Sequence, residues 1–114
     1  MVPKEGDIIE IDAAVAVGHE QQGRRPVLVV SVNALQSSLG LAMVCALTTH
    51  GGRAEGAGND LEVAVPPGLA VKGVILPHHL RTIDCKARNS EKLGTVPRAT
   101  LHATRSRLKT LLGL

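Results

Sequence analysis

The sequence predicts a small, partly open β-barrel that is followed by one C-terminal helix. Three observations favour this mainly β fold class. Several short apolar runs are rich in β-branched residues, turns containing glycine or proline separate them, and leucines recur at helical spacing near the C-terminus. The 114 residues are enough for one domain with a modest core, so we expect a single domain over residues 1–114.

Two strand patterns, joined by a polar loop, occupy the first third of the chain. Residues 6–12 partly alternate apolar and polar side chains, which is typical of a half-buried strand. The loop of residues 18–23 is bounded by glycines, which permit sharp turns close to a ligand. Pro26 pushes the residue before it into extended geometry, so a second strand is expected over residues 25–33, with Arg25 at its mouth.

A third strand is expected over residues 41–47, after a polar connection through residues 36–38. This run is continuously apolar, which indicates burial on both faces, and it ends in Thr48 and Thr49. Residues 51–59 contain four glycines and little hydrophobicity. We expect them to form a mobile surface loop that could act as a substrate gate.

The second half of the chain continues the β pattern and then changes to a helical one. Residues 61–65 alternate as a strand does, and a turn at residues 66–68 ends them. Residues 73–84 are interrupted at Pro77, which predicts a bent strand or a bulge. A short last strand over residues 93–96 is expected before the helix.

The helix is predicted from five residues at helical spacing and from its end signals. Pro97 suits the first helical position, and Gly113 suits the stop. The spaced residues are Leu101, Thr104, Leu108, Leu111 and Leu112.

Composition limits the classes of partner and of compartment. The net charge of +3 and the pI near 9.2 favour a polyanionic partner, and the chain has no Phe, Tyr or Trp on which bases could stack. Cys45 and Cys85 lack metal-ligand spacing and are predicted to be buried thiols in a reducing compartment. No apolar run approaches the roughly 18 residues of a membrane span, so we expect a cytoplasmic protein.

Six segments resemble, in order and spacing, the MazF/PemK (ChpB-like) toxins. They are residues 18–31, 47–49, 73–74, 81–84, 87–88 and 94–96. The resemblance covers nearly the whole chain and implies a PemK-like, SH3-like barrel that forms a homodimer. It also implies a sequence-specific endoribonuclease that cleaves single-stranded mRNA without metal or cofactor, leaves 2′,3′-cyclic phosphate and 5′-hydroxyl ends, and is blocked by a MazE-like antitoxin.

Arg25 and Thr48 are the catalytic residues that this resemblance implies. The guanidinium of Arg25 can hold two phosphoryl oxygens and stabilise the charge that develops in the transition state. Thr48 would hydrogen-bond the same phosphate and orient the reacting hydroxyl. Taken alone, the two residues fit a solvated strand-end arginine and an ordinary strand threonine better than a catalytic pair.

Further residues are predicted to contact RNA or to move protons. Glu20 would orient Arg25 or contact a base, while Arg24, Thr49 and Arg81 would bind RNA. His78 replaces an aspartate found in several relatives, so it is a candidate for acid–base catalysis or for base recognition. Its neighbour His79 is expected on the opposite strand face, and no metal site is expected.

Two other functions remain open from the sequence. A topoisomerase poison like CcdB shares the barrel, but that family acts through a C-terminal Trp-Gly-Ile, whereas this chain ends Leu-Gly-Leu. A non-catalytic SH3-like nucleic-acid-binding module is the other alternative.

The basic groove formed by Arg24, Arg25 and residues 51–59 is predicted to capture an acidic, disordered antitoxin segment.

Overall fold

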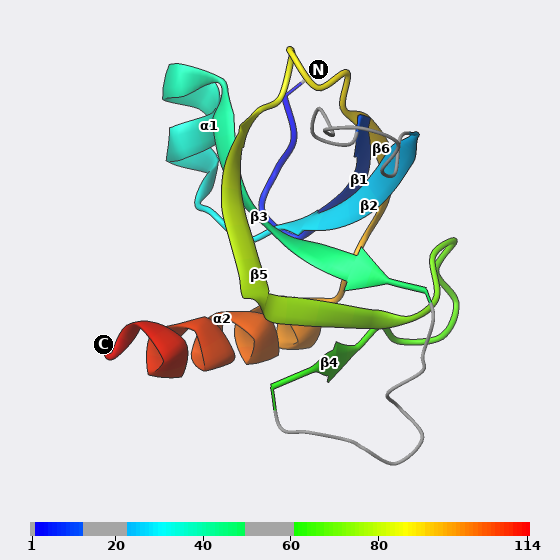
Figure 1. Cartoon of the computed structure of the whole chain (residues 1–114), viewed down its shortest axis with the longest axis vertical. Coiled ribbons are helices and arrows are strands. Elements are labelled where there is room, and N and C mark those ends of the chain that lie inside the picture. The colour runs from blue at the N-terminus through cyan, green and yellow to red at the C-terminus, as the bar shows by residue number, and fades with distance from the viewer. Residues whose placement is uncertain (1, 13–22, 50–60) are drawn as a thin grey trace, which may run out of the picture.

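The chain folds into a curled, six-stranded antiparallel sheet with two helices (Figure 1). The computed structural model describes residues 2–12, 23–49 and 61–114. The strands are β1 (Asp7–Asp12), β2 (Arg24–Val29), β3 (Leu41–Thr48), β4 (Val63–Ala64), β5 (Val74–Asp84) and β6 (Glu91–Thr95). The helices are α1 (Asn33–Leu39) and α2 (Arg98–Leu112). The spatial order β4-β5-β3-β2-β1-β6, together with the curl, confirms the predicted mainly β, partly open barrel.

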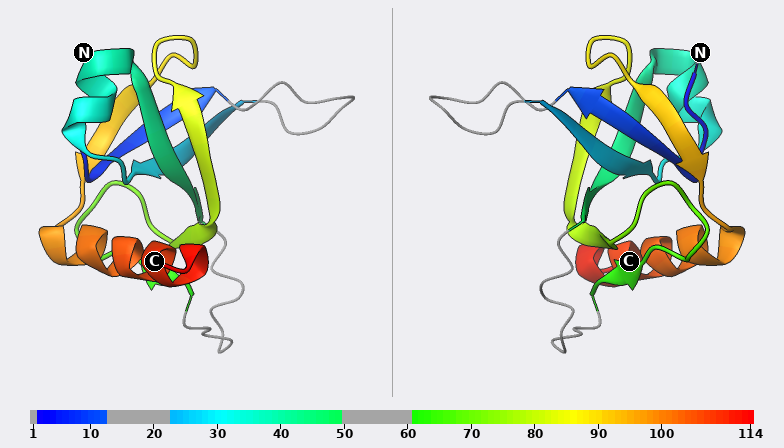
Figure 2. Two further views of the ribbon diagram at one scale, coloured as in Figure 1. Left: turned by 90° about the vertical axis from the view of Figure 1, so that its left-hand side faces the viewer. Right: turned by 90° about the vertical axis from the view of Figure 1, so that its right-hand side faces the viewer.

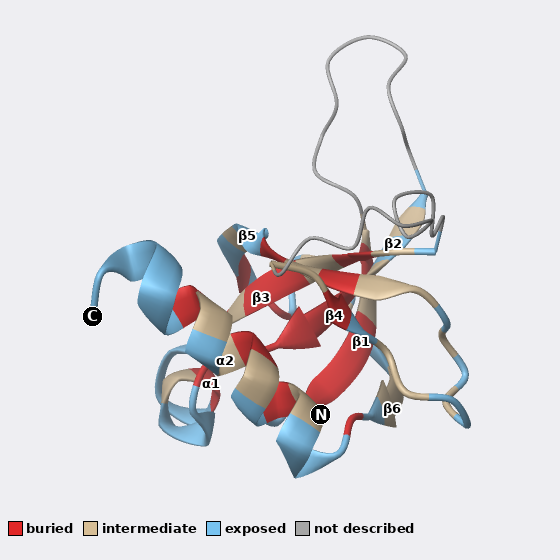
Figure 3. Cartoon of the chain, turned by 90° about the horizontal axis from the view of Figure 1, so that it is seen from below, coloured by how far each residue is buried: buried red, intermediate tan, exposed pale blue. Residues whose placement is uncertain are grey.

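Alternating side chains of the strands form two separate cores, one on each face of the sheet. Figure 3 shows that the buried residues lie along the strands and at intervals along α2. Leu28 and Cys45 belong to the core that includes Leu101 and Leu108 of α2. Val27, Val29, Ala42 and Val44 belong to the core on the other face. Because strand side chains alternate, each buried strand supplies both cores, which explains the unbroken apolar runs in the sequence.

A bulge bends β5 in the middle, as the proline interruption predicts (Figure 1). Cys45 of β3 pairs with Leu80, whereas the next residue, Ala46, pairs with Leu76. The three residues from Pro77 to His79 therefore have no partner on β3. Pro77 is buried, and its carbonyl oxygen lies 3.9 Å from Sγ of Cys45, which holds the bulge against the sheet.

Helix α1 was not predicted, and the second strand is shorter than predicted. We expected extended chain over residues 25–33, but β2 ends at Val29, and α1 occupies the predicted polar connection. Ser31 and Gln36 are buried and bind each other, and this contact places the helix against the sheet. Gly40 ends α1 with a left-handed φ of 71°, which suits glycine. A local pattern cannot reveal such a side-chain contact.

Other boundaries differ by smaller amounts. The predicted strand over residues 61–65 is reduced to Val63–Ala64, and β6 begins two residues earlier than predicted. Pro97 is the N-cap of α2 and not its first helical residue, whereas Gly113 ends the helix as predicted. Along α2, the buried residues Leu101, Thr104 and Leu108 confirm the predicted face.

The thiols of Cys45 and Cys85 are both free and buried, as predicted. Burial raises the pKa of Cys45 to about 12 and also raises the pKa of Cys85. Neither helix in the described part of the chain has the length and apolar character needed to cross a membrane.

Candidate active site

Arg25 lies at the exposed starting end of β2, next to buried Ile11 of β1, with which it pairs. It alternates with Val27 and Val29, so it lies on the face of the sheet opposite α2. Within residues 2–12, 23–49 and 61–114, no carboxylate forms an ion pair with its guanidinium. Figure 2 shows this end of β2 projecting away from α2. Arg25 is therefore a candidate to bind an anionic ligand.

Thr48 is the last residue of β3, and the strand register brings it to the same face as Arg25. Val27 pairs with Ala46 in the antiparallel β2–β3 ladder. The β2–β3 ladder ends at this pair, and Arg25 and Thr48 each lie two residues beyond it on their own strands. By strand alternation both lie on the face of Val27 and Ala46. Thr48 is partly exposed and pairs with Val74 of β5 on its other side. A guanidinium and a hydroxyl thus lie on the same sheet face, each two residues beyond the last β2–β3 pair.

Gly73 supports Thr48 and is a residue whose role the sequence did not reveal. Its φ of +131° favours glycine, and a Cβ built there would overlap the carbonyl oxygen of Thr48. The same Cβ would lie 3.0 Å from Cα of Thr49. The pair Gly73-Val74 carries part of the family resemblance, and this close backbone approach supplies a physical reason for the glycine.

Arg24 has partners within the chain, unlike Arg25. Its guanidinium donates to Asp12 at 2.9 Å and lies within 3.5 Å of carboxylate oxygens of Glu10 and Glu91. The hydrogen bond to Asp12, and after it the one to Glu10, hold the pKa of Arg24 above its usual value. We therefore assign Arg24 to positioning the ends of β1 and β2. Its predicted RNA contact remains a prediction.

Asp12 joins this network to the turn between β5 and β6. Asn89 Nδ2 donates to one carboxylate oxygen of Asp12 at 2.7 Å, and Arg88 donates to the Asp12 carbonyl oxygen at 3.1 Å. The hydrogen bonds from Asn89 and then Arg24 lower the pKa of Asp12. Asn89 has a left-handed φ of 51°, a conformation that asparagine tolerates. The sequence alone gave no signal for this long-range clamp.

His78 and His79 lie together, so the prediction that they point to opposite faces is wrong. Their ring centroids are 4.6 Å apart in an edge-to-face arrangement with an interplanar angle of 82°. Successive side chains point to opposite faces only in a regular strand, and the bulge between Leu76 and Leu80 interrupts this alternation. Both histidines are exposed, and the bulge lies beside the Cys45–Ala46 step of β3, two residues before Thr48.

The remaining predicted residues have different positions. Thr49 is exposed directly after β3, and Arg81 is exposed on β5, opposite Val44. The pairing with Val44 puts Arg81 on the face of Arg25 and Thr48, four β3 positions from Thr48. Glu20 and residues 51–59 lie outside the described residues. No group of three metal-ligating side chains occurs among the residues that the structure describes.

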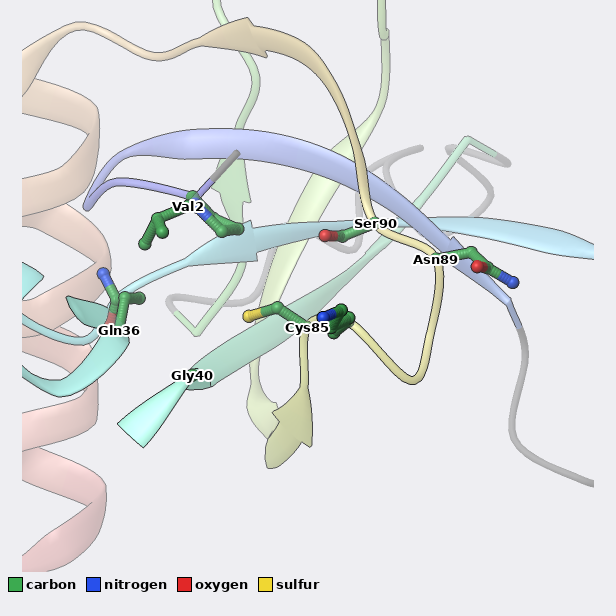
Figure 4. A pocket seen from close by; sticks show the side chains of 8 residues that line it. Val2, Gln36, Gly40, Cys85, Asn89 and Ser90 are labelled. Atoms are coloured by element: carbon green, nitrogen blue, oxygen red, sulfur yellow. The ribbon is translucent and has the colours of Figure 1, made fainter. Parts of the chain in front are cut away.

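One hollow in the described surface lies beside α1 and the β5–β6 turn. It has a volume of about 460 Å³ and is lined by α1, the N-terminal segment and the β5–β6 turn (Figure 4). Cys85 and Gln36 are among its lining residues, and none of the predicted site residues is.

Comparison with known proteins identifies the family. Residues 4–112 match the family described as PemK-like, MazF-like toxin of type II toxin-antitoxin system. The chain is 36% identical to endoribonuclease PemK of Escherichia coli over 94% of this chain and 80% of the relative. It is 39% identical to endoribonuclease toxin ChpB of Escherichia coli strain K12, over 78% of this chain and 76% of the relative.

A solved structure agrees in fold over the whole chain. The crystal structure of MazE-MazF (Form-II) from Deinococcus radiodurans matches with a TM-score of 0.87 and 36% identity, covering 100% of this chain and 98% of the matched one. The strand-end site lies on the fold that this relative shares. The chain therefore belongs to the PemK-like, MazF-like toxins of type II toxin–antitoxin systems, and it is an endoribonuclease toxin.

Proposed function

We propose that this toxin cleaves single-stranded mRNA at specific sequences, without a metal ion, by attack of the substrate's own 2′-hydroxyl, and so stops translation and growth. The observation that carries this proposal is the exposed guanidinium of Arg25, which has no carboxylate partner in the described parts of the chain and lies on the same sheet face as Thr48. A phosphodiester needs such a fixed cation, because charge develops on its non-bridging oxygens.

The reaction conserves one negative charge on the phosphate. The 2′-oxygen attacks phosphorus and loses its proton to a base, while the bond from phosphorus to the 5′-oxygen breaks and that oxygen takes up a proton. The products are a 2′,3′-cyclic phosphate and a 5′-hydroxyl. Arg25 would donate two hydrogen bonds to the phosphoryl oxygens, and Thr48 would hold the attacking group in line.

Arg24, Asp12 and Asn89 would support this site indirectly. They fix the end of β1 and the start of β2, and therefore the backbone that carries Arg25. Gly73 would do the same for Thr48. Thr49 and Arg81 are exposed near the same face and are suited to bind flanking phosphates.

We also propose a homodimer and a MazE-like antitoxin as partners in the cytoplasm. The matched Deinococcus structure is a MazE-MazF complex. An acidic, disordered antitoxin segment would be attracted to Arg25 and would block substrate there. A dimer would cover the apolar end of α2, where Leu111, Leu112 and Leu114 are 43%, 58% and 81% exposed.

The deciding experiment maps the ends produced from a long mixed-sequence RNA with excess chelator present. We expect cleavage to persist and to leave 2′,3′-cyclic phosphate ends, and a 2′-deoxy nucleotide at the cut site should abolish cleavage while binding survives. Arg25→Ala and Thr48→Ala should each lower kcat more than affinity, with the Arg25 loss about 10²–10³-fold. Lys86→Ala, an exposed cation beside the 460 Å³ hollow, is the control.

Three outcomes would contradict the proposal. If Arg25→Ala cleaved as fast as the parent at saturating RNA, the site would be wrong. If the parent bound RNA without cutting it, the binding-module interpretation would be favoured. Loss of cutting with chelator, restored by a divalent ion, would contradict the metal-independent mechanism.

A further inference from the structure

Helix α2 carries a strongly basic surface that the proposed active site does not use. Its 15 residues include four Lys or Arg and one His but no Asp or Glu. With 3.6 residues per turn, four of these basic side chains fall within about 60° of arc around the helix axis. They form a stripe along one flank of α2, which we call the basic stripe: Arg98, His102, Arg105 and Lys109.

One member of the basic stripe is anchored to the chain, and the other three are exposed. Arg105 donates to the Val30 carbonyl oxygen at 2.9 Å and to Glu5 at 2.7 Å. Arg98, His102 and Lys109 are exposed, and none has an ion pair with a described carboxylate. The stripe thus keeps most of its positive charge for an external partner.

A hollow lies within the basic stripe. It has a volume of about 350 Å³ and is lined by Arg98, Ala99, Leu101, His102 and Arg105. Three of its five lining side chains are basic, and they come from successive turns of α2. A phosphate group would find hydrogen-bond donors on several sides there, because a guanidinium presents a planar fork of donors.

The basic stripe is separate from the strand-end site. Helix α2 packs on the core that includes Leu28 and Cys45, whereas Arg25 and Thr48 alternate with residues of the core on the other face. From Arg98 to Lys109 the stripe is about 16 Å long, at 1.5 Å per residue. An elongated ligand could therefore contact it over several residues.

We propose that the basic stripe binds the phosphodiester backbone of single-stranded RNA, without sequence preference, and holds long substrates by segments that flank the cut site. This inference rests on the proposed function in taking RNA as the substrate. Charge complementarity supports it, because a stripe without carboxylates and with exposed cations matches a uniform polyanion. The flat groups of Arg98 and His102 can also stack on bases, in a chain without Phe, Tyr or Trp.

RNA fits the basic stripe better than an acidic protein segment does. A segment that folds on binding needs apolar anchor sites, because hydrophobic burial must offset the entropy of its ordering. Between Arg98 and Lys109, the leucines Leu101 and Leu108 are buried in the core. The exposed leucines lie only beyond Lys109, at the end of α2.

The test compares two variants that remove the same formal charge. The first carries Arg98→Gln, His102→Gln and Lys109→Gln, and the second carries Lys4→Gln and Lys86→Gln. Both control lysines are exposed, and they lie in or next to the wall of the other hollow. The probes are uridine oligomers of 30 and 6 nucleotides, made uncleavable by 2′-O-methylation, and binding is measured by fluorescence anisotropy from 50 to 200 mM salt.

We expect the triple variant to bind the 30-mer roughly five- to tenfold more weakly than the parent at 100 mM salt. The slope of log K against log salt should fall in magnitude by about 1.4, because each phosphate contact on a single strand contributes about 0.7. Binding of the 6-mer, and of both oligomers to the control variant, should change less than twofold. Unfolding temperatures of both variants should match the parent, since the replaced side chains are exposed.

Three outcomes would overturn the inference. The first is that the triple variant binds the 30-mer as tightly as the parent does. The second is that the control variant loses as much affinity for the 30-mer as the triple variant. The third is that a polyglutamate peptide displaces the 30-mer as effectively as unlabelled RNA of equal charge does. Failure of the proposed function is measured separately, since it appears as absence of cutting in unmodified RNA. If the parent protein failed to cut RNA, but only the triple variant lost binding of the 30-mer, the result would support RNA binding by the basic stripe and contradict the catalytic proposal.

Discussion

A side chain at Gly73 would overlap the carbonyl oxygen of Thr48, so the start of β5 and the end of β3 meet backbone to backbone. This contact fixes the strand end that carries the proposed catalytic hydroxyl. It also explains why the chain keeps a glycine with φ of +131° at that position.

We expect Gly73→Ala to lower the rate of RNA cleavage at least tenfold and to destabilise the fold by more than the control Gly68→Ala. Gly68 also has a positive φ, of 97°, but a Cβ there meets no atom within 4 Å. Both changes carry the strain of a left-handed backbone, about 1–2 kcal/mol, and only Gly73→Ala must displace Thr48. Steady-state kinetics and denaturant unfolding measure the two effects. Equal kinetic losses in both variants would contradict the support of Thr48 by Gly73.

The network around Asp12 predicts a dependence of stability on pH. Hydrogen bonds from Asn89 and Arg24 lower the pKa of Asp12 in the folded chain. Such a carboxylate adds stability above its unfolded pKa, near 3.9, and this stability is lost as the pH falls through the lower folded pKa. We expect the denaturant midpoint to fall between pH 5 and pH 2, and to fall less in Asp12→Asn. A variant with the same fall as the parent would exclude Asp12 as a contributor.

The strand patterns could be read from the sequence because burial controls them locally. The runs that became β2 and β3 alternate between two cores, and Pro77 marked the bulge of β5 correctly. Helix α1 was missed because its position depends on the buried contact between Ser31 and Gln36. This contact depends on tertiary packing, which periodicity does not record.

The candidate site was predictable in part, for a similar reason. Arg25 and Thr48 were proposed from the family motifs, and strand alternation puts both on the face of Val27 and Ala46. The different environments of Arg24 and Arg25 were not predictable, since they depend on carboxylates of β1 and β6. The edge-to-face contact of His78 and His79 depends on how many residues the bulge contains.

The two thiols should react at different rates in the folded protein. Cys45 is fully buried with a pKa of about 12, whereas Cys85 is 6% exposed and lines the 460 Å³ hollow. Because the thiolate is the reactive form, we expect a thiol reagent at pH 8 to label Cys85 slowly and Cys45 only after denaturation. Mass spectrometry of the parent and of Cys85→Ser measures this. Equal labelling of both cysteines in the native chain would contradict the described burial.

The exposed leucines of α2 should control the oligomeric state. We expect the parent to have about twice the chain mass of 11.9 kDa at micromolar concentration, and Leu111→Asp with Leu112→Asp to yield a monomer. Leu39→Asp, at an exposed leucine of α1, is the matched control. Sedimentation measures all three. A monomeric parent would reject the dimer, and a dimeric double variant would place its interface elsewhere.

The ring pair of His78 and His79 should bind a base and not transfer a proton. Both rings are exposed on a bulge near Thr48, and their contact forms a small aromatic platform in a chain that has no larger ring. Stacking of one base contributes about 1–3 kcal/mol. We therefore expect His78→Ala to raise KM for RNA at least fivefold and to change kcat less than threefold.

His78→Phe separates stacking from proton transfer, because phenylalanine has a ring but cannot accept a proton. We expect it to restore KM to within about twofold of the parent and to leave the pH profile of kcat unchanged. His79→Ala should raise KM less than His78→Ala, if its main contact is the 4.6 Å edge-to-face packing against His78. A loss of kcat in both His78 variants, together with loss of one limb of the pH profile, would instead place His78 in proton transfer, since a general acid or base contributes about 10²–10⁴-fold to the rate.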